Sequence, residues 1–165
     1  LDRFGDCWWI DHATGERTVW DAADGQWTGP MPFASGGGGL VSTLDDYHRF
    51  ARFVLAGGTA PDGRRLLSAD LVQQMTSDQL TAEQRRTGPH PDGSEGWGFG
   101  VGVQVDARPA APAGSYGWSG GLGTMWRTDP SRDLIAIVLT VEMFTDPSMP
   151  ALIEDFFVGA FAATA

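Results

Sequence analysis

The spacing of apolar and polar positions along this chain changes near residue 96. Between residues 43 and 76, apolar side chains recur every three or four positions, which predicts helices. Over residues 96–141 they alternate with glycine or form short continuous runs, which predicts strands. A helical spacing returns over residues 147–161. The sequence therefore predicts an α/β (α+β) chain: a helical region, an antiparallel sheet of about three strands, and a covering C-terminal helix.

The first helix has the clearest local signals. Ser42 and Thr43 each precede an Asp by three positions, which resembles a capping box with Asp in place of Glu. Gly57-Gly58 marks the end of the helix. Between these signals runs a helical apolar stripe formed by Leu44, Tyr47, Phe50, Ala51, Val54 and Leu55.

Turn signals divide the rest of the first 95 residues. Residues 1–34 are predicted to form short strands and turns, with Trp8–Ile10 and Arg17–Trp20 as the two arms of a hairpin. A shorter helix is expected from about Ser68, as its N-cap, to Thr76. Residues 77–96 show no period and are predicted to be mainly loop. We expect the chain to be one C-terminal fragment of a domain, with segments 1–34, 35–95 and 96–165.

Three strand signals follow. Trp97–Val105 alternates apolar residues with glycine, which predicts one strand with a bare face, and residues 115–128 predict a second strand. Leu134–Val141 is almost continuously apolar, as is typical of a strand in the middle of a sheet. As the last of three antiparallel strands it would instead lie at an edge, so it should lack a neighbour. The terminal helix is expected to bury one side, formed by Leu152, Ile153, Phe156, Phe157 and Ala160.

Composition narrows the choice of partners. The formal charge of −10 argues against nucleic acid or an anionic membrane surface as partner. All 11 basic residues are arginine, so the chain has no lysine. The single cysteine, Cys7, excludes an internal disulfide and a cysteine-rich zinc site, and we expect it to be a buried thiol. No apolar run approaches the roughly 20 residues that cross a bilayer.

Metal and cofactor signals are weak. His12, His48 and His90 fall in a hairpin, on a helix and in a loop, and no pair has the spacing of a helical metal site. The segment Asp21–Gly25 superficially resembles the start of a calcium-binding loop, but it lacks the later ligands of such a loop. A surface turn is the better interpretation. The glycine run Gly36–Gly39 precedes a helix but lacks the lysine of a phosphate loop. We expect neither a metal nor a cofactor.

The segment from Gly114 to Trp126 contains five glycines and points to a ligand. Glycine weakens a strand and marks a bulge or the close approach of a ligand, so this segment predicts a substrate lying along a sheet edge. Alternatively, these glycines lie opposite bulky tryptophans for packing. The seven tryptophans of the chain also allow a carbohydrate-binding surface as a rival function.

At family level the chain resembles the C-terminal part of serine β-lactamase-like proteins, in the branch of class C β-lactamases, related esterases and D-aminopeptidases. The resemblance rests on the order of four segments: Gly36–Asp46, Gly96–Gly102, Gly117–Gly121, and an Asp-Pro turn followed by Leu134–Leu139. It covers most of the chain. It implies hydrolysis of a β-lactam, ester or amide through an acyl-serine intermediate. The alternative is a catalytically inactive relative that serves as a binding module.

The resemblance also assigns roles to one segment. Family members carry Ser-x-x-Lys, Tyr-x-Asn and Lys/His-Thr/Ser-Gly motifs, and here Trp118-Ser119-Gly120 takes the third position as a substrate-binding wall. Tryptophan in place of the cation resembles the esterase branch. The amide of Gly121 would then be one donor of an oxyanion hole. Without lysine the chain holds no Ser-x-x-Lys, so we expect the nucleophile outside it, and pairing with an N-terminal half or with a second copy through the sheet edge.

Overall fold

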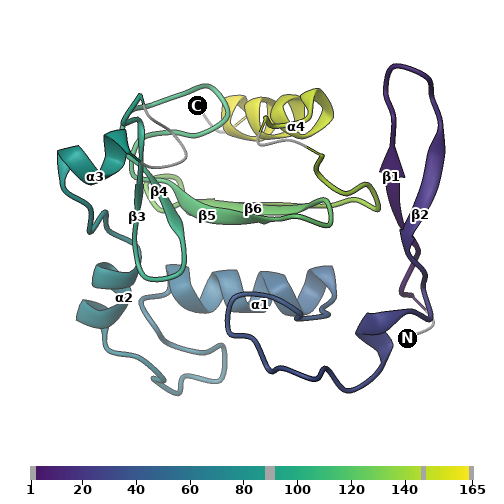
Figure 1. Cartoon of the computed structure of the whole chain (residues 1–165). Helices are drawn as coiled ribbons and strands as arrows, with labels where there is room; N and C mark the ends of the chain where they lie inside the picture. Colours follow the sequence, from purple (N-terminus) through teal and green to yellow (C-terminus); the bar gives the residue numbers. More distant parts are fainter. Residues whose placement is uncertain (1–2, 88–91, 146–147, 164–165) are drawn as a thin grey trace.

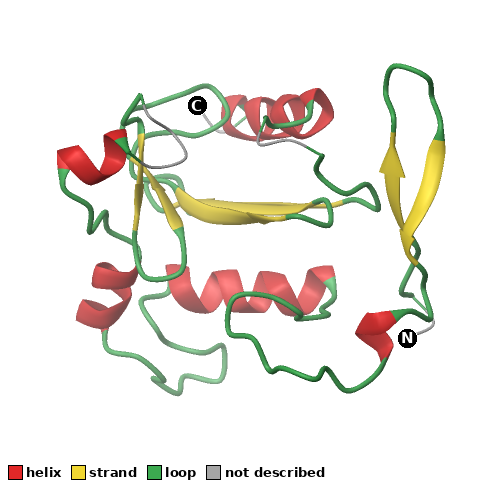
Figure 2. Cartoon of the chain, viewed as in Figure 1, coloured by secondary structure: helices red, strands yellow, loops and turns green. Residues whose placement is uncertain are grey.

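A three-layer arrangement appears in the computed structural model, which describes residues 3–87, 92–145 and 148–163. A five-stranded sheet lies between helix α1 (Leu44–Leu55) on one face and helix α4 (Ala151–Ala162) on the other (Figure 1). A separate hairpin, β1 (Cys7–Ile10) and β2 (Arg17–Asp21), stands beside these layers (Figure 2). The predicted α/β class is confirmed.

All neighbouring strands of the main sheet are antiparallel, in the order β3-β4-β5-β6-β7. The sheet thus has five strands where the sequence predicted about three. The strands are β3 (Glu95–Trp97), β4 (Gly102–Gln104), β5 (Tyr116–Gly120), β6 (Thr124–Asp129) and β7 (Leu134–Leu139).

Two expected single strands are in fact hairpins. The prediction of one strand over 97–105 is wrong because the backbone turns at Gly98–Val101, where the amide of Gly98 donates to the carbonyl of Val101 at 2.9 Å. Gly100 has φ +84°, and a Cβ on Gly98 would lie 2.0 Å from the carbonyl oxygen of Met75. Alternating glycines here serve a tight turn against a helix end, not an extended strand. Residues 115–128 likewise divide into β5 and β6.

The helix boundaries follow their local signals. Thr43 caps α1 by accepting a hydrogen bond from the Asp46 amide at 3.2 Å, and Gly57 and Gly58 end the helix with positive φ. Helix α2 (Ala69–Met75) begins after the predicted cap Ser68. Helix α3 (Ala82–Arg86) corrects the loop prediction for residues 77–96. Its signal was a capping box, Thr81 with Gln84, in a segment too short for an apolar period.

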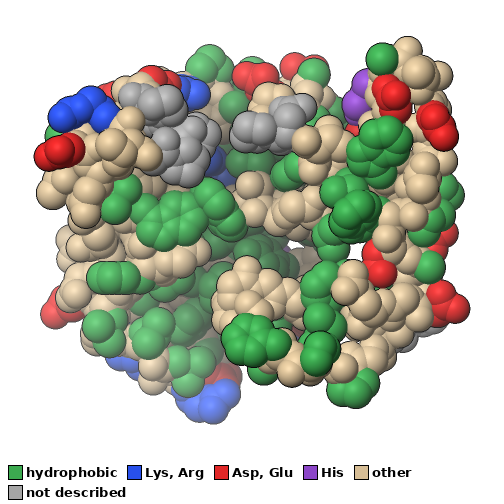
Figure 3. All heavy atoms as spheres, viewed as in Figure 1, with side chains coloured by type: hydrophobic (Ala, Val, Ile, Leu, Met, Phe, Trp, Pro, Cys, Tyr) green, Lys and Arg blue, Asp and Glu red, His purple; other side chains and the backbone are tan. Residues whose placement is uncertain are grey.

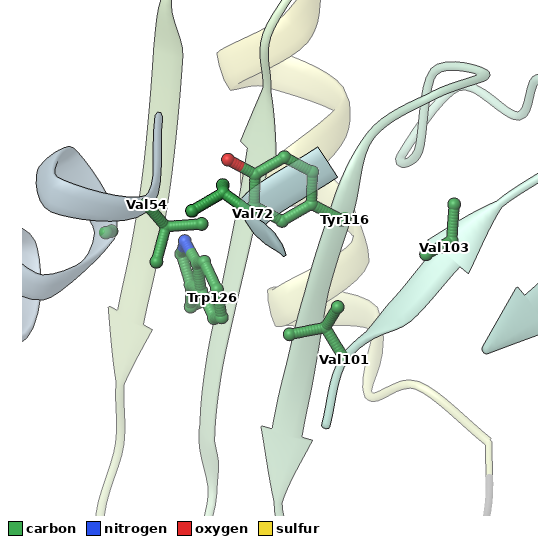
Figure 4. Packing of buried hydrophobic residues seen from close by; sticks show 7 residues of the cluster. Val54, Val72, Val101, Val103, Tyr116 and Trp126 are labelled. Carbon is green, nitrogen blue, oxygen red and sulfur yellow. The ribbon is translucent and has the colours of Figure 1, made fainter. Parts of the chain in front are cut away.

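Two apolar clusters hold the layers together. Between α1, α2 and the sheet lie Val54, Val72, Val101, Val103, Tyr116 and Trp126 (Figure 4). Between α4 and the sheet, Ile153, Phe157 and Phe161 are buried against Met125 and Ala136. The predicted face of α4 is wrong in part, because Leu152 and Phe156 are exposed. Within the described ranges, no helix is long and apolar enough to span a membrane.

Strand β7 forms one edge of the sheet, as expected from its place as the last strand. Its faces contact α1 and α4, which explains its apolar composition. No strand of the described residues pairs with its outer edge between Leu134 and Leu139. Just beyond it, Trp8 of β1 bonds to the backbone of Val141 and Met143 at 2.7 and 2.9 Å. This contact attaches the β1–β2 hairpin to the body.

Candidate active site

The β5–β6 hairpin carries all four residues predicted for the site. Trp118 pairs with Trp126 and Gly120 with Thr124, so the turn consists of Gly121, Leu122 and Gly123. The amide of Gly123 donates to the carbonyl of Gly120 at 3.1 Å, and Gly123 has φ +82°. A three-residue hairpin turn ending in a left-handed residue requires glycine at that position.

A segment after β7 supports this turn from the side. The Phe144 amide donates to the Gly121 carbonyl at 2.8 Å, and the Thr140 hydroxyl donates to the Gly123 carbonyl at 2.7 Å. A Cβ on Gly123 would lie 2.0 Å from the carbonyl oxygen of Glu142. The turn is therefore fixed by bonds and by close packing against residues 140–144.

These bonds leave the amide of Gly121 as an open donor. That N–H shares a peptide group with the Gly120 carbonyl, which is bound inside the turn, so in a trans peptide the N–H points the opposite way. Within the described part of the chain, no group accepts a hydrogen bond from it. Gly121 is exposed, and a Cβ built on it meets no atom within 4 Å. The geometry suits a donor to a ligand atom.

Aromatic side chains line the neighbouring surface. The Trp118 side chain is 42% exposed and meets Trp97 of β3 edge to face, with ring centroids 4.3 Å apart. Backbone bonds of Trp97 to Asp78 and Gln79 hold that strand in place. Phe99, in the β3–β4 turn, is 61% exposed. Figure 3 shows hydrophobic side chains gathered on this side of the molecule over β3–β5 and toward α1 and α2.

Other predicted site residues lie along the same strand. Ser119 is half-buried opposite Met125, and its hydroxyl has no hydrogen bond to the described residues. A Cβ on Gly120 would lie 2.6 Å from the hydroxyl of Thr124, and one on Gly117 would lie 1.9 Å from the carbonyl oxygen of Trp126. Gly117 and Gly120 thus pack closely against β6, Gly117 against backbone and Gly120 against a threonine hydroxyl, and neither packs against a tryptophan side chain as the alternative interpretation expected. Gly121 has no such constraint.

Both tyrosines pack into the apolar cluster, Tyr116 buried and Tyr47 half-buried. Burial raises the pKa of Tyr116 to about 12, and burial also raises the pKa of Tyr47. Their rings pack against Trp126 with centroid distances of 5.9 and 5.7 Å. A buried phenol that keeps its proton at neutral pH is a poor proton acceptor, so neither residue is a candidate base.

The remaining candidates form no shared site. His12 contacts Glu142 at 2.5 Å, His48 is exposed on α1, and His90 lies outside the described residues. Asp21 begins a turn in which its carboxylate accepts from the Gln26 amide. Cys7 is buried. Across residues 3–87, 92–145 and 148–163, no three His, Cys, Asp or Glu side chains are grouped to hold a metal.

Several supporting residues had no sequence signal. Thr140 and Phe144 act through bonds to a turn about 20 residues earlier in the chain. Glu95 and Arg127 lie 32 positions apart and form a buried ion pair. For the positive φ of Gly123, the Gly-x-Gly spacing of Gly121 and Gly123 is a local signal of a hairpin turn. Pairs this distant in sequence follow no short-range pattern.

The chain thus combines an antiparallel sheet that has a helix on each face with a glycine-rich hairpin next to the exposed Trp118. The family model described as Beta-lactamase matches residues 6–155. The chain therefore belongs to the β-lactamase family.

Relatives and neighbours are longer proteins. Protein Rv1367c of Mycobacterium tuberculosis is 42% identical in an alignment of 122 positions that covers 67% of this chain and 29% of that protein. The chain therefore spans less than a third of the curated relatives that it matches. Among solved structures, simvastatin synthase (LovD) of Aspergillus terreus is similar with a TM-score of 0.66 and 23% identity, covering 96% of this chain and 41% of that one. Its LovD6 mutant is similar with a TM-score of 0.67 and 21% identity, covering 96% of this chain and 42% of that one. At these identities the likeness concerns the fold.

Proposed function

We propose that this chain forms the sheet wall of a serine hydrolase that cleaves an ester, amide or β-lactam bond through an acyl-serine intermediate. One observation carries the proposal: the open amide of Gly121, fixed by the turn and lying near the exposed Trp118. Acyl transfer needs preorganised donors where negative charge develops on the carbonyl oxygen. The Gly121 amide has that character, and membership in the β-lactamase family supports the role.

The nucleophile, in this proposal, comes from polypeptide outside these 165 residues. A Ser-x-x-Lys motif needs a lysine, and the sequence has none. The greater length of the relatives supports a second portion that carries it. Neither Tyr47 nor Tyr116 is placed to act as the base, since Tyr116 is buried in the core and Tyr47 is half-buried against it.

The substrate we favour is a neutral ester with an apolar acyl or alcohol group. Trp118 presents an indole where a carboxylate-binding cation would stand, and Phe99 adds apolar surface in the β3–β4 turn. The nearest cation along the hairpin, Arg127, has a side chain only 5% exposed and paired with Glu95. A wall of this kind favours apolar groups over a carboxylate.

The partner that we propose for the sheet is the N-terminal portion of the same domain, paired with the outer edge of β7. An apolar groove of about 370 Å³ lies along this edge. It is lined by Leu44, Asp45, His48, Ile135, Ala136, Ile137, Phe156 and Ala160. An unpaired apolar edge needs a strand or a covering element.

A catalytically inactive binding module is the second candidate. It is favoured by the lack of Ser-x-x-Lys in these residues. A carbohydrate platform is less well supported, because Trp97 and Trp118 meet at 88° and Trp126 is buried, so these rings offer no shared flat face.

The test compares the chain alone with a longer polypeptide of the same protein that contains Ser-x-x-Lys. With a chromogenic cephalosporin and a p-nitrophenyl ester, we expect the chain alone to be inert and the longer protein to prefer the ester. An inactive longer protein would favour the binding module. Turnover by the chain alone that disappears in Ser119→Ala would instead make Ser119 the nucleophile and overturn the proposal.

A further inference from the structure

A buried ion pair joins two strands that are not neighbours. Glu95 lies on β3 and Arg127 on β6, with β4 and β5 between them. Their side chains are 12% and 5% exposed, and Arg127 Nη2 donates to Glu95 Oε1 at 3.5 Å. Arg127 Nη1 also donates to the hydroxyl of Ser115 at 3.5 Å. Charged groups this deeply buried need a structural or functional reason.

Two glycines make the long reach possible. Gly102 of β4 and Gly117 of β5 pair directly with each other, and Gly117 also pairs with Arg127. A Cβ on Gly102 would lie 2.5 Å from Glu95 Oε1, and one on Gly117 would lie 2.8 Å from the Cα of Arg127. We call Gly102 and Gly117 the glycine pair. Any side chain on Gly102 would occupy the space that the Glu95 carboxylate takes.

The indole of Trp118 shares that space. The same Cβ on Gly102 would lie 3.3 Å from Cε3 of Trp118. On the other side, Trp118 meets the ring of Trp97, two residues after Glu95 on the same strand. The ring thus lies next to Gly102 and in contact with the Trp97 ring, in the same region as the Glu95 carboxylate.

We propose that Glu95 and Arg127 are positioning residues, which fix the Trp118 indole by an ion pair across the glycine pair. The Glu95–Arg127 ion pair determines where the Glu95 carboxylate lies and therefore which space is left to the Trp118 indole. As a consequence the exposed face of Trp118 keeps one orientation toward the substrate. Only this last step rests on the proposed function, since the positioning of the ring is a property of the chain itself.

The energetics of burial explain why Glu95 and Arg127 act as a unit. Burial lowers the pKa of the Arg127 guanidinium, and the Glu95 carboxylate opposes that shift. Removal of Arg127 takes away a donor that holds the Glu95 carboxylate beside Gly102, and removal of Glu95 leaves the buried guanidinium without its charged partner. Either change alters the space beside Trp118 that the Glu95 carboxylate fills and so frees the ring.

The experiment measures the Trp97–Trp118 contact without any enzyme assay. Two indoles held edge to face give an exciton couplet in far-ultraviolet circular dichroism, and the difference between wild type and Trp118→Phe isolates it. We expect Glu95→Gln and Arg127→Met each to lose most of this couplet. Arg127→Lys keeps the positive charge but loses the planar guanidinium with its several N–H donors, so it should keep part of the couplet.

Matched controls separate positioning from general destabilisation. Asp129→Asn removes the buried carboxylate of a different ion pair, Asp129–Arg132, close to Arg127 at the end of the same strand, and should keep the couplet. The double variant Glu95→Gln/Arg127→Met leaves no buried charge unpaired, so it should fold even where a single variant does not, and it should still lose the couplet.

The outcomes are distinct. A wild-type couplet in the folded double variant, or an equal loss in Asp129→Asn, would overturn the proposal. In the longer protein with Ser-x-x-Lys, Glu95→Gln should raise KM for the ester with kcat nearly unchanged. Loss of the couplet with unchanged KM would leave the positioning intact and count against Trp118 as a substrate wall.

Discussion

Glycines in the β5–β6 hairpin serve three different physical purposes. Gly117 is required because a side chain would collide with β6, and Gly123 because its φ is positive. Gly121 has neither requirement, and its amide is open. Sequence alone marks all three as alike. Only the backbone geometry separates the residue that could serve a ligand from those that serve the fold.

Gly121 offers a clean test because proline fits its position. It occupies the second position of a turn that follows an extended residue, where proline is well tolerated. We expect Gly121→Pro to fold with nearly unchanged stability but, in the longer enzyme, to lower kcat by on the order of 10²–10³, because it removes one oxyanion donor. Urea denaturation and steady-state kinetics measure the two effects.

Gly121→Ala is the control for this substitution. It keeps the amide, and its Cβ meets no atom within 4 Å, so kcat should stay close to that of the wild type. A Gly121→Pro enzyme with parental kcat would remove this amide from the mechanism.

Asp129 predicts a pH dependence of stability. Burial alone would raise the pKa of its carboxyl, but hydrogen bonds from Ser131 and Arg132 outweigh burial and hold the pKa below its ordinary value. A lowered folded-state pKa stabilises the protein above the unfolded value of about 3.9, and this stabilisation is lost as pH falls through the folded value. Asp129→Asn should therefore cost about 1–3 kcal/mol at neutral pH and less in acid.

The measurement is a series of urea denaturation curves from neutral pH downward for both proteins. A difference in unfolding free energy that stays constant with pH would contradict this account of Asp129.

At the scale of elements, the two tryptophans of the hairpin should behave differently. Trp126 is 3% exposed and packs against Tyr47, Phe50 and Tyr116, so Trp126→Ala should lower the unfolding free energy by about 3–5 kcal/mol. Trp118 is largely open on one side, so Trp118→Ala should cost less stability. In the longer enzyme it should act mainly on KM.

Equal losses of stability in the two variants would assign Trp118 to the core. That result would also remove the main support for a site wall on β5.

Elements with local signals were predictable, and those defined by distant contacts were not. The caps of α1 and α2 appear in the sequence as Thr43 and Ser68, and the structure confirms both. The sequence predicts the 97–105 segment wrongly because alternation with glycine resembles a strand with a bare face. Its purpose depends on Met75, which lies far away in the sequence. Phe156 likewise faces solvent because α4 covers a sheet that ends at β7.

For the candidate site, the sequence predicted the residues of the hairpin but not the residues that support it. Trp118 and Gly121 emerged from the order of family-like segments, not from their own neighbours. The supports at Phe144 and Glu95 join the site only through the fold. Their amino-acid types carry no hint of a role.

At the scale of the molecule, the open edge of β7 predicts self-association of the isolated chain. Leu139 and Val141 are exposed at or beyond this edge, beside the apolar groove. Exposed strand edges with apolar flanks pair with other strands. We expect light scattering at micromolar concentration to show dimers or larger species, and Leu139→Lys to shift them toward monomer.

Leu66→Lys is the matched control, since Leu66 is equally an exposed leucine but lies in the loop before α2. It should leave the association unchanged. A monomeric wild-type chain would argue against β7 as a pairing edge.

The segment that follows β7 ties distant parts of the chain into one cooperative unit. Its Met143 amide bonds to Trp8 of the N-terminal hairpin, and the next amide, that of Phe144, bonds to Gly121. Local opening of such a short strap breaks both bonds in a single event. Hydrogen exchange at these two adjacent amides therefore reports, from one stretch of backbone, on the docking of the hairpin and on the integrity of the turn that orients the Gly121 amide.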